Sequence, residues 1–364
     1  MSGKRIDHRL AHRGGWVELL RLPALAYSAA AKTNAWLYGR GMRSRLRVDA
    51  PVVSVGNLSA GGTGKTPTVA WLARWFQAKG LRPGIVSRGY GAAAQGAALN
   101  DEARMLADQL PGVPHEQNPD RVAGAQRLVD AGVDVVLMDD GFQHRRLVRD
   151  LDLVLVDAAR PWGLPAPGPG EAPVCAVLPR GLLREPAGAL ARASALVITR
   201  SDTVDAASLA RLRAELARAA PGVPCLLASH APVALVDWDR GFLSLDQLQG
   251  LEVDLLSGVG NPEAVQASIE ALGGRVIDHR ARPDHHPWTQ ADLVGLGDRP
   301  VVTTAKDRPK LEELRPLAGG LAPWTLEIEL AFREGEEELE HLLERLPVGG
   351  ARRQRDAIHG GLHG

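Results

Sequence analysis

The sequence predicts an open, doubly wound α/β fold, and three observations support this prediction. Short apolar runs alternate along the chain with stretches whose apolar residues recur at helical spacing. The runs at 133–140 and 151–158 are apolar almost throughout, as expected for strands of a parallel sheet that helices cover on both faces. A glycine-rich turn joins the first apolar run, 51–56, directly to a helical stretch.

The elements of the main domain follow one another in a regular order. The helix predicted over 66–80 carries Val69, Leu72 and Phe76 at helical spacing, and Gly80 ends it. The remaining predicted elements are a strand at 84–87, helices in DEARMLADQL and DRVAGAQRLVDAG, strands at 133–140, 151–158 and 195–200, a helix around 204–219 and a short strand near 224–228.

A second, smaller α/β unit is predicted from about residue 230 onward. Strands at 253–260, 274–280 and 299–307 alternate with helices at 262–272 and 289–296, and an acidic helix at 334–346 precedes a tail that is predicted to be disordered. The predicted organisation is therefore an N-terminal helical segment at 1–50, a main domain at 51–230, a smaller α/β domain at 231–332, and a C-terminal helix and tail at 333–364.

The composition excludes several functional classes. The 364 residues include 43 Lys and Arg and 43 Asp and Glu, so the formal net charge is zero and no global basic field attracts nucleic acid. The two cysteines, Cys175 and Cys225, form neither a disulfide framework nor a metal cluster, and this usage suits a reducing cytosol.

The N-terminal segment at 16–40 leaves two interpretations open. Its longest uncharged run, between Arg21 and Lys32, is about half of the roughly 20 residues that a membrane-spanning helix needs, and no small-residue cleavage site follows it. The segment either packs on the main domain or lies on a membrane surface. Aromatic residues suited to the headgroup boundary and arginines suited to anionic lipid are Tyr27, Trp36, Tyr38, Arg40, Arg43, Arg45 and Arg47.

The string GNLSAGGTGKTP at 56–67 predicts a phosphate-binding P-loop. Gly64, Lys65 and Thr66 stand at the start of the predicted helix, where backbone N–H groups and the helix dipole attract phosphate, Lys65 neutralises its charge and Thr66 ligates Mg²⁺. Ser59 occupies the position where the strict pattern has its first glycine, and a glycine-rich hairpin turn is the alternative. The predicted nucleotide-binding residues of the loop are Ser59, Ala60, Gly61, Gly62, Thr63, Gly64, Lys65 and Thr66.

Two adjacent carboxylates follow the buried strand at 133–140. Asp139 and Asp140 stand where a P-loop protein needs a carboxylate for Mg²⁺, and Gly141 lets the chain turn. One aspartate is expected to face the metal ion and the other to contact water or the phosphoryl acceptor. The alternative is a pair that caps a helix.

Four motifs in this order and spacing resemble the tetraacyldisaccharide 4′-kinase family: GNLSAGGTGKTP, SRGYG (87–91), DDGFQH (139–144) and LPRGLLREP (178–186). The resemblance covers roughly residues 15–330. It implies a P-loop NTPase-type fold, ATP and Mg²⁺ as cofactors, and phosphorylation of the 4′-hydroxyl of the disaccharide-1-phosphate precursor of lipid A. It also implies an N-terminal helix that contacts the inner membrane from the cytoplasmic side, with no nucleic acid and no obligate protein partner.

The resemblance assigns a catalytic base and a histidine that pairs with it. Asp101, followed by Glu102, matches the catalytic aspartate, although Asn100 replaces the glycine that usually precedes it. Asp284-His285 matches the Asp-His motif of the second domain; His286 is adjacent, and the choice between the two histidines stays open. A carboxylate that accepts the proton of a sugar hydroxyl, oriented by a histidine, is chemically reasonable. The alternatives are a helix N-cap for Asp101 and surface positions for the histidines.

Arginines and amides complete the implied site. Arg184 of LREP is expected to stabilise the transferring phosphoryl group, and a structural ion pair between Arg184 and Glu185 is the alternative. Arg121 resembles a second phosphate-side arginine, and Gln143 is expected in the nucleotide site, beside His144. Lys306-Asp307 resembles the T-x-K-D motif of the family, which we expect to organise the domain interface. The family consensus LPAGPLREP is altered at Arg180 and Leu182.

Two other functions remain as alternatives. A P-loop switch ATPase of the membrane-partitioning kind is disfavoured because Ser59 and Ala60 stand where that class has a second lysine. A soluble small-molecule kinase that shares only the P-loop is the other. The predicted function is therefore an ATP-dependent 4′-kinase of lipid A synthesis.

Overall fold

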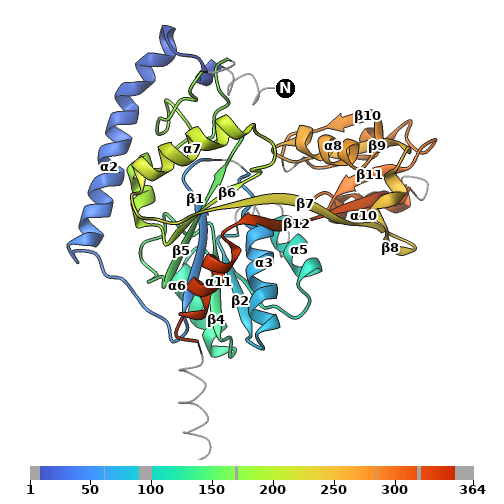
Figure 1. Ribbon diagram of the computed structural model, residues 1–364. Coiled ribbons are helices and arrows are strands. Elements are labelled where there is room, and N and C mark those ends of the chain that lie inside the picture. The colour runs from blue at the N-terminus through green and yellow to red at the C-terminus, as the bar shows by residue number, and fades with distance from the viewer. Residues whose placement is uncertain are drawn as a thin grey trace, which may run out of the picture. The chain divides into compact units, whose positions relative to one another are not determined.

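The computed structural model describes residues 9–60, 62–89, 101–168, 171–284, 286–317 and 321–348 (Figure 1). Gly61, His285 and the C-terminal tail at 349–364 lie outside the described residues. The chain divides into two compact units. Within the described residues, the first unit holds 9–89, 110–229 and 331–348, and the second holds 101–109 and 230–330.

A parallel sheet forms the centre of the first unit (Figure 1). Its strands lie in the order β3-β2-β4-β1-β5-β6-β7, so the strand that leads into the P-loop is in the middle. The strand β3 was not predicted, because the three residues HEQ carry no apolar signal. The strands are β1 (Val52–Asn57), β2 (Pro83–Ser87), β3 (His115–Gln117), β4 (Val135–Asp139), β5 (Leu151–Asp157), β6 (Ala195–Thr199) and β7 (Cys225–Asp237).

Helices cover both faces of this sheet. The helix α3 buries Val69, Leu72 and Phe76 completely, which confirms the apolar face expected from the sequence. On other parts of the sheet, Leu128 of α6 and Leu216 of α7 are buried in separate apolar clusters. The helical elements of this unit are η1 (Gly15–Leu20), α2 (Arg21–Gly39), α3 (Lys65–Ala78), α6 (Arg121–Asp130), η2 (Ala187–Arg192), α7 (Ala206–Ala219) and α11 (Glu336–Glu344).

The second unit has a smaller set of parallel strands. Its strands belong to the same continuous sheet and lie in the order β10-β9-β11-β12-β7, and β8 pairs with the distal part of β7 in an antiparallel hairpin. The strands are β8 (Gly241–Leu243), β9 (Glu252–Ser257), β10 (Arg275–Ala281), β11 (Val301–Thr304) and β12 (Trp324–Glu334), and the helical elements are α5 (Asp101–Gln109), η3 (Leu245–Leu248), α8 (Pro262–Ala271), α9 (Gln290–Leu293), α10 (Arg308–Leu314) and η4 (Arg315–Leu317).

Further features of the fold were also absent from the sequence prediction. The strand β7 continues to Asp237 instead of ending near 228, and β12 and α10 were not predicted. The helix α5 belongs to the second unit although its sequence neighbours on both sides belong to the first. Long-range packing decides this placement, and a local pattern carries no information about it.

Candidate active site

The predicted P-loop connects β1 to α3 at the centre of the first unit's sheet. The strand ends at Asn57, and the helix begins at Lys65 with Gly64 as its N-cap in a left-handed conformation (φ 88°). The free N–H groups of the first helical turn therefore stand at the carboxyl edge of the sheet, where a phosphate is favoured. Ser59 and Thr63 are buried, at 4% and 3% exposure.

The LPRGLLREP segment lies directly against this loop. The N–H of Ala60 donates to the carbonyl of Leu182 (2.8 Å), and the N–H of Arg184 donates to the carbonyl of Leu58 (2.7 Å). Ser59 and Leu183 form an antiparallel bridge between the same two segments. Two motifs that are far apart in the sequence are thus joined through backbone hydrogen bonds.

Residues after β5 and β6 hold the other side of the loop. The hydroxyl of Thr199 donates to the carbonyl of Thr63 (2.9 Å), and Arg200 donates through Nη1 to the carbonyl of Gly62 (3.1 Å). Arg200 is itself fixed by an ion pair with Asp157 at the end of β5. The sequence analysis missed these three side chains; their position at the ends of predicted parallel strands was the available signal.

Asn57 is a further residue that the sequence analysis missed. It is completely buried at the end of β1, and its Nδ2 donates to the carbonyl of Ser59 (2.8 Å) while its Oδ1 lies 3.5 Å from Nζ of Lys65. The Nε2 of Gln143 donates to the Asn57 carbonyl (2.8 Å). Gln143, which the resemblance placed in the nucleotide site, thus supports the strand end that leads into the loop.

Three charged side chains converge beside the P-loop. Nζ of Lys65 lies 3.6 Å from Oδ1 of Asp140, and Nη1 of Arg184 lies 2.8 Å from each carboxylate oxygen of Asp140. Burial alone would raise the pKa of Asp140, but the charges of Lys65 and Arg184 outweigh it and hold that pKa below its usual range. Asp140 is therefore ionised and neutralised by two cations that are suited to bind phosphate oxygens.

The DDGFQH turn brings these groups together. Asp140 has a positive φ of 52°, which an aspartate tolerates better than most residues. Phe142 is completely buried against Gly56 of β1, where an added Cβ would lie only 2.6 Å from the Phe142 Cβ. A side chain at position 56 would therefore displace the turn that carries Asp140 from the P-loop.

Glu185 does not form the structural pair with Arg184 that was the alternative. Glu185 is buried and lies 3.0 Å from both Arg145 and Arg192, while Arg184 pairs with Asp140. The guanidinium of Arg192 also lies over the ring of Phe142, 4.4 Å from its centroid. Neighbouring residues of the LREP motif thus have different environments: Arg184 lies beside the P-loop, and Glu185 lies in a buried cluster.

Arg121 is buried at the start of α6 and donates to the carbonyl of Asn118 (3.0 Å). Its positive charge contributes to lowering the pKa of Asp140. Burial, followed by the charge of Arg121, lowers the pKa values of His115 and His144 to about 4. Both histidines are therefore neutral at physiological pH.

The oxygen ligands that Mg²⁺ prefers are present at this edge of the sheet. Thr66 follows Lys65 in the first turn of α3, and Asp139 ends β4, where it is in register with Val55 of β1. A hydroxyl and a carboxylate beside a phosphate site match the usual Mg²⁺ donor set. Asp140 is engaged by Lys65 and Arg184, and the assignment of the two aspartates to the metal ion stays a prediction.

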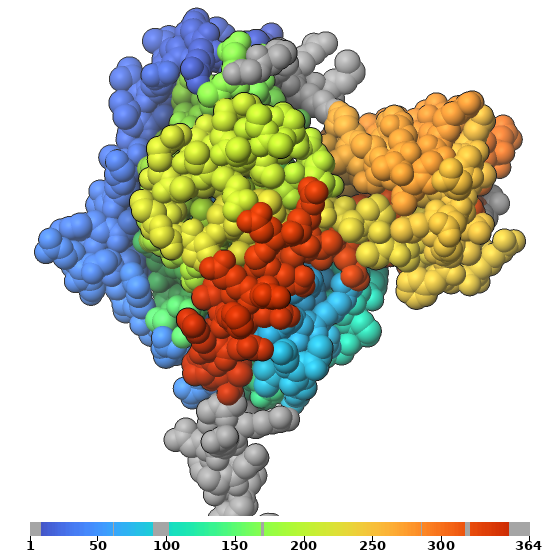
Figure 2. All heavy atoms as spheres, viewed as in Figure 1, coloured from blue at the N-terminus to red at the C-terminus, as the bar shows by residue number. Residues whose placement is uncertain are grey.

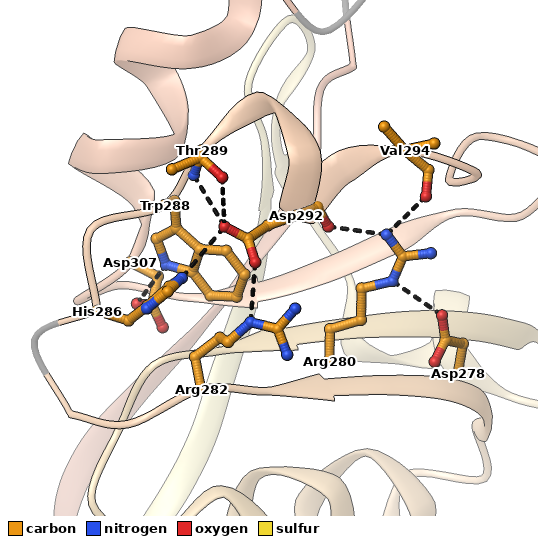
Figure 3. Close-up of polar contacts among 9 residues, drawn as sticks. All are labelled: Asp278, Arg280, Arg282, His286, Trp288, Thr289, Asp292, Val294 and Asp307. Atoms are coloured by element: carbon orange, nitrogen blue, oxygen red, sulfur yellow. Dashed lines mark hydrogen bonds and ion pairs between the residues drawn. The ribbon is translucent and has the colours of Figure 1, made fainter. Parts of the chain in front are cut away.

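The predicted base region belongs to the second unit. Asp101 is the first residue of α5, and its side chain lies outside what the structure describes, as does His285. Asp284 is described, and its Oδ1 lies 2.7 Å from Nζ of Lys306. His286 points toward Asp292, with 3.1 Å between Nε2 and Oδ2 (Figure 3). His286 is thus engaged by Asp292, and the pairing of Asp101 with a histidine stays a prediction.

Comparisons with known proteins agree with the motifs. The family model for tetraacyldisaccharide-1-P 4′-kinase matches residues 16–347. A tetraacyldisaccharide 4′-kinase of Alkalilimnicola ehrlichii is 40% identical over 339 residues, covering 90% of this chain and 92% of the relative. One of Anaeromyxobacter dehalogenans (strain 2CP-C) is 38% identical over 347 residues, covering 89% of each.

A solved structure shows the same fold. The crystal structure of LpxK from Aquifex aeolicus, described as an "apo" form in complex with ATP, superimposes with a TM-score of 0.71 at 28% identity. The match covers 91% of this chain and 99% of the other. With the P-loop, the DDGFQH turn and the LREP segment assembled as described, these matches show that the chain belongs to the tetraacyldisaccharide-1-P 4′-kinase family.

Proposed function

We propose that this protein transfers the γ-phosphoryl group of ATP to the 4′-hydroxyl of the tetraacyl-disaccharide 1-phosphate precursor of lipid A. The observation that carries this proposal is the convergence of Lys65, Asp140 and Arg184 beside the P-loop of a chain in this family. Phosphoryl transfer depends mainly on positioning and on charge stabilisation, and this cluster supplies both.

Each residue of the cluster has a distinct role in the proposed reaction. Lys65 binds the β- and γ-phosphates at the N-terminus of α3, together with the backbone N–H groups of the loop. Arg184 stabilises negative charge on the equatorial oxygens of the transferring group. Asp140 holds both cations in place before the nucleotide arrives, because it lies within 3.6 Å of Lys65 and 2.8 Å of Arg184. Buried Arg121 adds positive charge to the same region.

Mg²⁺, when bound with ATP, would supply positive charge that neutralises the negative charge developing on the phosphate oxygens. Thr66 and Asp139 are the residues that would hold it, directly or through water. Asp140 is the second carboxylate, and its contacts with Arg184 favour an orienting role.

Asp101 is proposed as the base that accepts the proton of the sugar hydroxyl. A hydroxyl is a poor nucleophile at neutral pH, and a carboxylate within hydrogen-bond reach contributes by general-base catalysis. His285 would orient Asp101 and share its charge, while His286 is held by Asp292. This assignment rests on the matching motifs.

We further propose that η1 and α2 lie on the cytoplasmic face of the inner membrane, where ATP is available. Figure 2 shows this N-terminal segment as a ridge along the first unit. Among the described residues, no helix has the length and apolar character needed to cross a bilayer. Interfacial binding is supported by large apolar side chains that are exposed to solvent, at Trp16 (63%), Leu19 (71%), Leu22 (70%), Leu25 (66%), Trp36 (51%) and Met42 (65%).

Arginines flank this apolar surface at the C-terminal end of α2. The guanidinium of Arg40 lies 5.5 Å from the ring centroid of Trp36, and that of Arg43 lies 5.8 Å from the ring centroid of Tyr38. Aromatic rings beside arginines are suited to the boundary between headgroups and acyl chains. Anionic headgroups would add electrostatic attraction.

The test is transfer of ³²P from γ-labelled ATP to tetraacyl-disaccharide 1-phosphate in mixed micelles. The wild-type protein should form a labelled 4′-phosphate product, and Lys65→Ala should not. Lys79→Ala is the matched control, because Lys79 follows the same helix and is half exposed, with an ion pair to Glu344 (3.0 Å) and a position over the Trp75 ring (5.0 Å to the centroid). If the wild-type protein forms no more product than Lys65→Ala, the proposed activity is wrong.

The same assay separates the two alternative functions. A membrane-partitioning switch ATPase would hydrolyse ATP and dimerise with nucleotide without labelling the lipid. A soluble small-molecule kinase would keep its activity and its sedimentation behaviour after deletion of residues 1–45. Neither outcome is expected.

A further inference from the structure

The T-x-K-D motif at 304–307 has a buried carboxylate at its centre. Asp307 has no exposed surface, and its Oδ2 accepts hydrogen bonds from the Thr304 hydroxyl (2.7 Å) and from the N–H of Gly258 (2.8 Å). Its Oδ1 accepts from Nε1 of Trp288 (2.9 Å; Figure 3). One side chain therefore fixes the turn after β11, the end of β9 and the loop before α9.

The backbone around the motif is closely packed. An added Cβ at Gly258 would lie 2.7 Å from Oδ1 of Asp307, so the backbone approaches the carboxylate as closely as a glycine allows. A buried acceptor with several neutral donors is costly to disturb, since each donor would lose its hydrogen bond without gaining one to water. The backbone of Lys306, next to Asp307, is consequently held in one position.

Lys306 uses that fixed position to bridge two carboxylates of its own unit. Its Nζ lies 2.7 Å from Oδ1 of Asp284 and 3.2 Å from Oε1 of Glu102, and its side chain is 17% exposed. Burial would lower the pKa of Lys306, but the two carboxylates outweigh it and raise that pKa above its usual value. Lys306 is therefore a charged link between the first turn of α5 and the loop after β10.

The loop after β10 is fixed from the other side by Asp292 (Figure 3). Arg282 donates through Nε to Oδ1 of Asp292 (2.8 Å), and Nε2 of His286 lies 3.1 Å from its Oδ2. The hydroxyl of Thr289 donates to the same Oδ2 (2.8 Å) and completes a capping box for α9. Asp284 thus lies between two anchors, with Lys306 on one side and the Asp292 network on the other.

We propose that Lys306 is a positioning residue for the base of the phosphoryl-transfer reaction. By pairing with Glu102 and Asp284, it sets the N-terminal turn of α5, and with it the backbone of Asp101, against the loop after β10. The inference rests on the proposed role of Asp101 as the base. Lys306 itself makes no contact with the reacting atoms in this proposal.

The expected effect is on the rate of the chemical step. A general base acts only when its oxygen lies within about 2.6–3.2 Å of the atom that carries the proton, and a displacement of about 1 Å costs on the order of 10²-fold in rate. The carboxylates of Glu102 and Asp284 are 30% and 38% exposed, so water can solvate them when Lys306 is replaced, and the loss of global stability should be small. Loss of Lys306 should therefore lower kcat without unfolding the protein.

A second ion pair of α5 provides a matched control. Nη1 of Arg104 lies 2.7 Å from Oε1 of Glu313 on α10, so Arg104 also fixes α5 to the second unit. Arg104 is farther along the helix than Glu102, and its ion pair contacts neither Glu102 nor Asp284. A general need to hold α5 would make Arg104 and Lys306 equally important.

The experiment compares Lys306→Met, Lys306→Arg and Arg104→Met in the full chain, with steady-state kinetics in mixed micelles and thermal melting of each variant. For Lys306→Met we expect kcat to fall by about 10²-fold, with the KM values for ATP and lipid within about threefold of wild type. Lys306→Arg should have a kcat at least about tenfold above that of Lys306→Met. The kcat of Arg104→Met should stay near wild type, and the melting temperatures of all three variants should be unchanged.

A double variant shows whether Lys306 acts through Asp101. Because residues that act as a unit are not additive, Asp101→Asn with Lys306→Met should be no slower than Asp101→Asn alone. If the fold-losses in kcat of the two single variants multiplied in the double variant, Lys306 would act independently of Asp101, and the inference would be overturned. The inference would also be overturned if Lys306→Met had an unchanged kcat, changed only the KM for lipid, or had a lowered melting temperature. An equal loss of kcat in Arg104→Met would overturn it as well.

The proposed function and this inference fail in different ways. If Asp101→Asn is inactive and Lys306→Met is fully active, the base assignment stands and only the role of Lys306 is wrong. If Asp101→Asn keeps wild-type turnover, the base assignment is wrong and the positioning role falls with it. If the inference is correct, Asp101→Asn and Lys306→Met each form product slowly. The double variant then shows whether Lys306 acts through Asp101.

Discussion

Arg184 and Asp140 are joined through Nη1, which lies 2.8 Å from each of the two carboxylate oxygens. The contact orients a guanidinium beside the P-loop before any nucleotide is bound, and the backbone N–H of the same arginine donates to the carbonyl of Leu58 (2.7 Å). The main chain of Arg184 is therefore held by the segment that leads into the P-loop, and its side chain is held by Asp140. Pre-organised charge of this kind needs no rearrangement when negative charge develops during transfer.

Arg184→Ala should lower kcat by about 10²–10³-fold, the usual loss when one transition-state donor is removed, with little change in the KM for ATP. Steady-state kinetics in mixed micelles measure both constants. Arg146→Ala is the control, because Arg146 forms a half-exposed ion pair with Asp120 (2.8 Å) and should keep wild-type activity. A raised KM for ATP with unchanged kcat would show that Arg184 binds only the ground state.

Asp101→Asn tests the proposed base. The amide cannot accept the hydroxyl proton, so kcat should fall by about 10²-fold or more while ATP affinity stays nearly intact. Kinetics and equilibrium binding of ATP give the two quantities. Asp108→Asn, at an exposed position in the last turn of the same helix, should behave as wild type. Near-full turnover in Asp101→Asn would instead assign Asp101 to capping α5.

The exposed apolar surface of η1 and α2 predicts a specific membrane defect. Leu19→Glu combined with Leu22→Glu places two charges where side chains are 71% and 70% exposed, so folding should be unaffected. Burial of each leucine is worth about 1.5–3 kcal/mol, and vesicle binding should weaken by at least about 10²-fold. Flotation with anionic phospholipid vesicles measures this binding.

A second exposed apolar residue provides the control for that experiment. Phe242 on β8 is 81% exposed but lies in the other unit, and Phe242→Glu should leave vesicle binding unchanged. Activity of the Leu19→Glu/Leu22→Glu variant on detergent-dispersed lipid should stay within about twofold of wild type, since the catalytic residues are intact. Unchanged flotation of that variant would contradict an interfacial role for α2.

The sequence predicted those parts of the site that local pattern determines. Lys65 and Thr66 are predicted because a glycine-rich turn between a strand and a helix is typical of a phosphate-binding loop, and the fold class follows from apolar runs at 133–140 and 151–158. Asn57 and Arg200 escaped prediction because their roles arise only when the strand ends meet at one edge of the sheet. The bridge from Lys306 to Glu102 escaped for the same reason, since the placement of α5 is set by tertiary packing.

The lowered pKa of His115 predicts how the stability of the first unit depends on pH. Burial, followed by the charge of Arg121, lowers its pKa from 6.5 to about 4, while Glu116 opposes this shift. Nε2 of His115 lies 2.8 Å from the Ser87 hydroxyl, and the native ring stays neutral. Between these two pKa values the unfolded chain binds a proton that the folded chain does not, so stability is full above pH 6.5 and falls as the pH drops toward 4.

The loss attributable to His115 between pH 7.5 and pH 5 should be about 2 kcal/mol, because each pKa unit corresponds to about 1.4 kcal/mol. Urea unfolding of the full chain, monitored by tryptophan fluorescence, gives the free energy of unfolding at each pH. The loss for wild type minus the loss for His115→Gln is the contribution of His115. The variant cannot titrate, so its stability should decline less on acidification. His341→Gln, at an exposed position on α11, should retain the wild-type decline. Equal declines in wild type and His115→Gln would mean that His115 is protonated in the folded protein, and the neutral ring beside Ser87 would then be wrong.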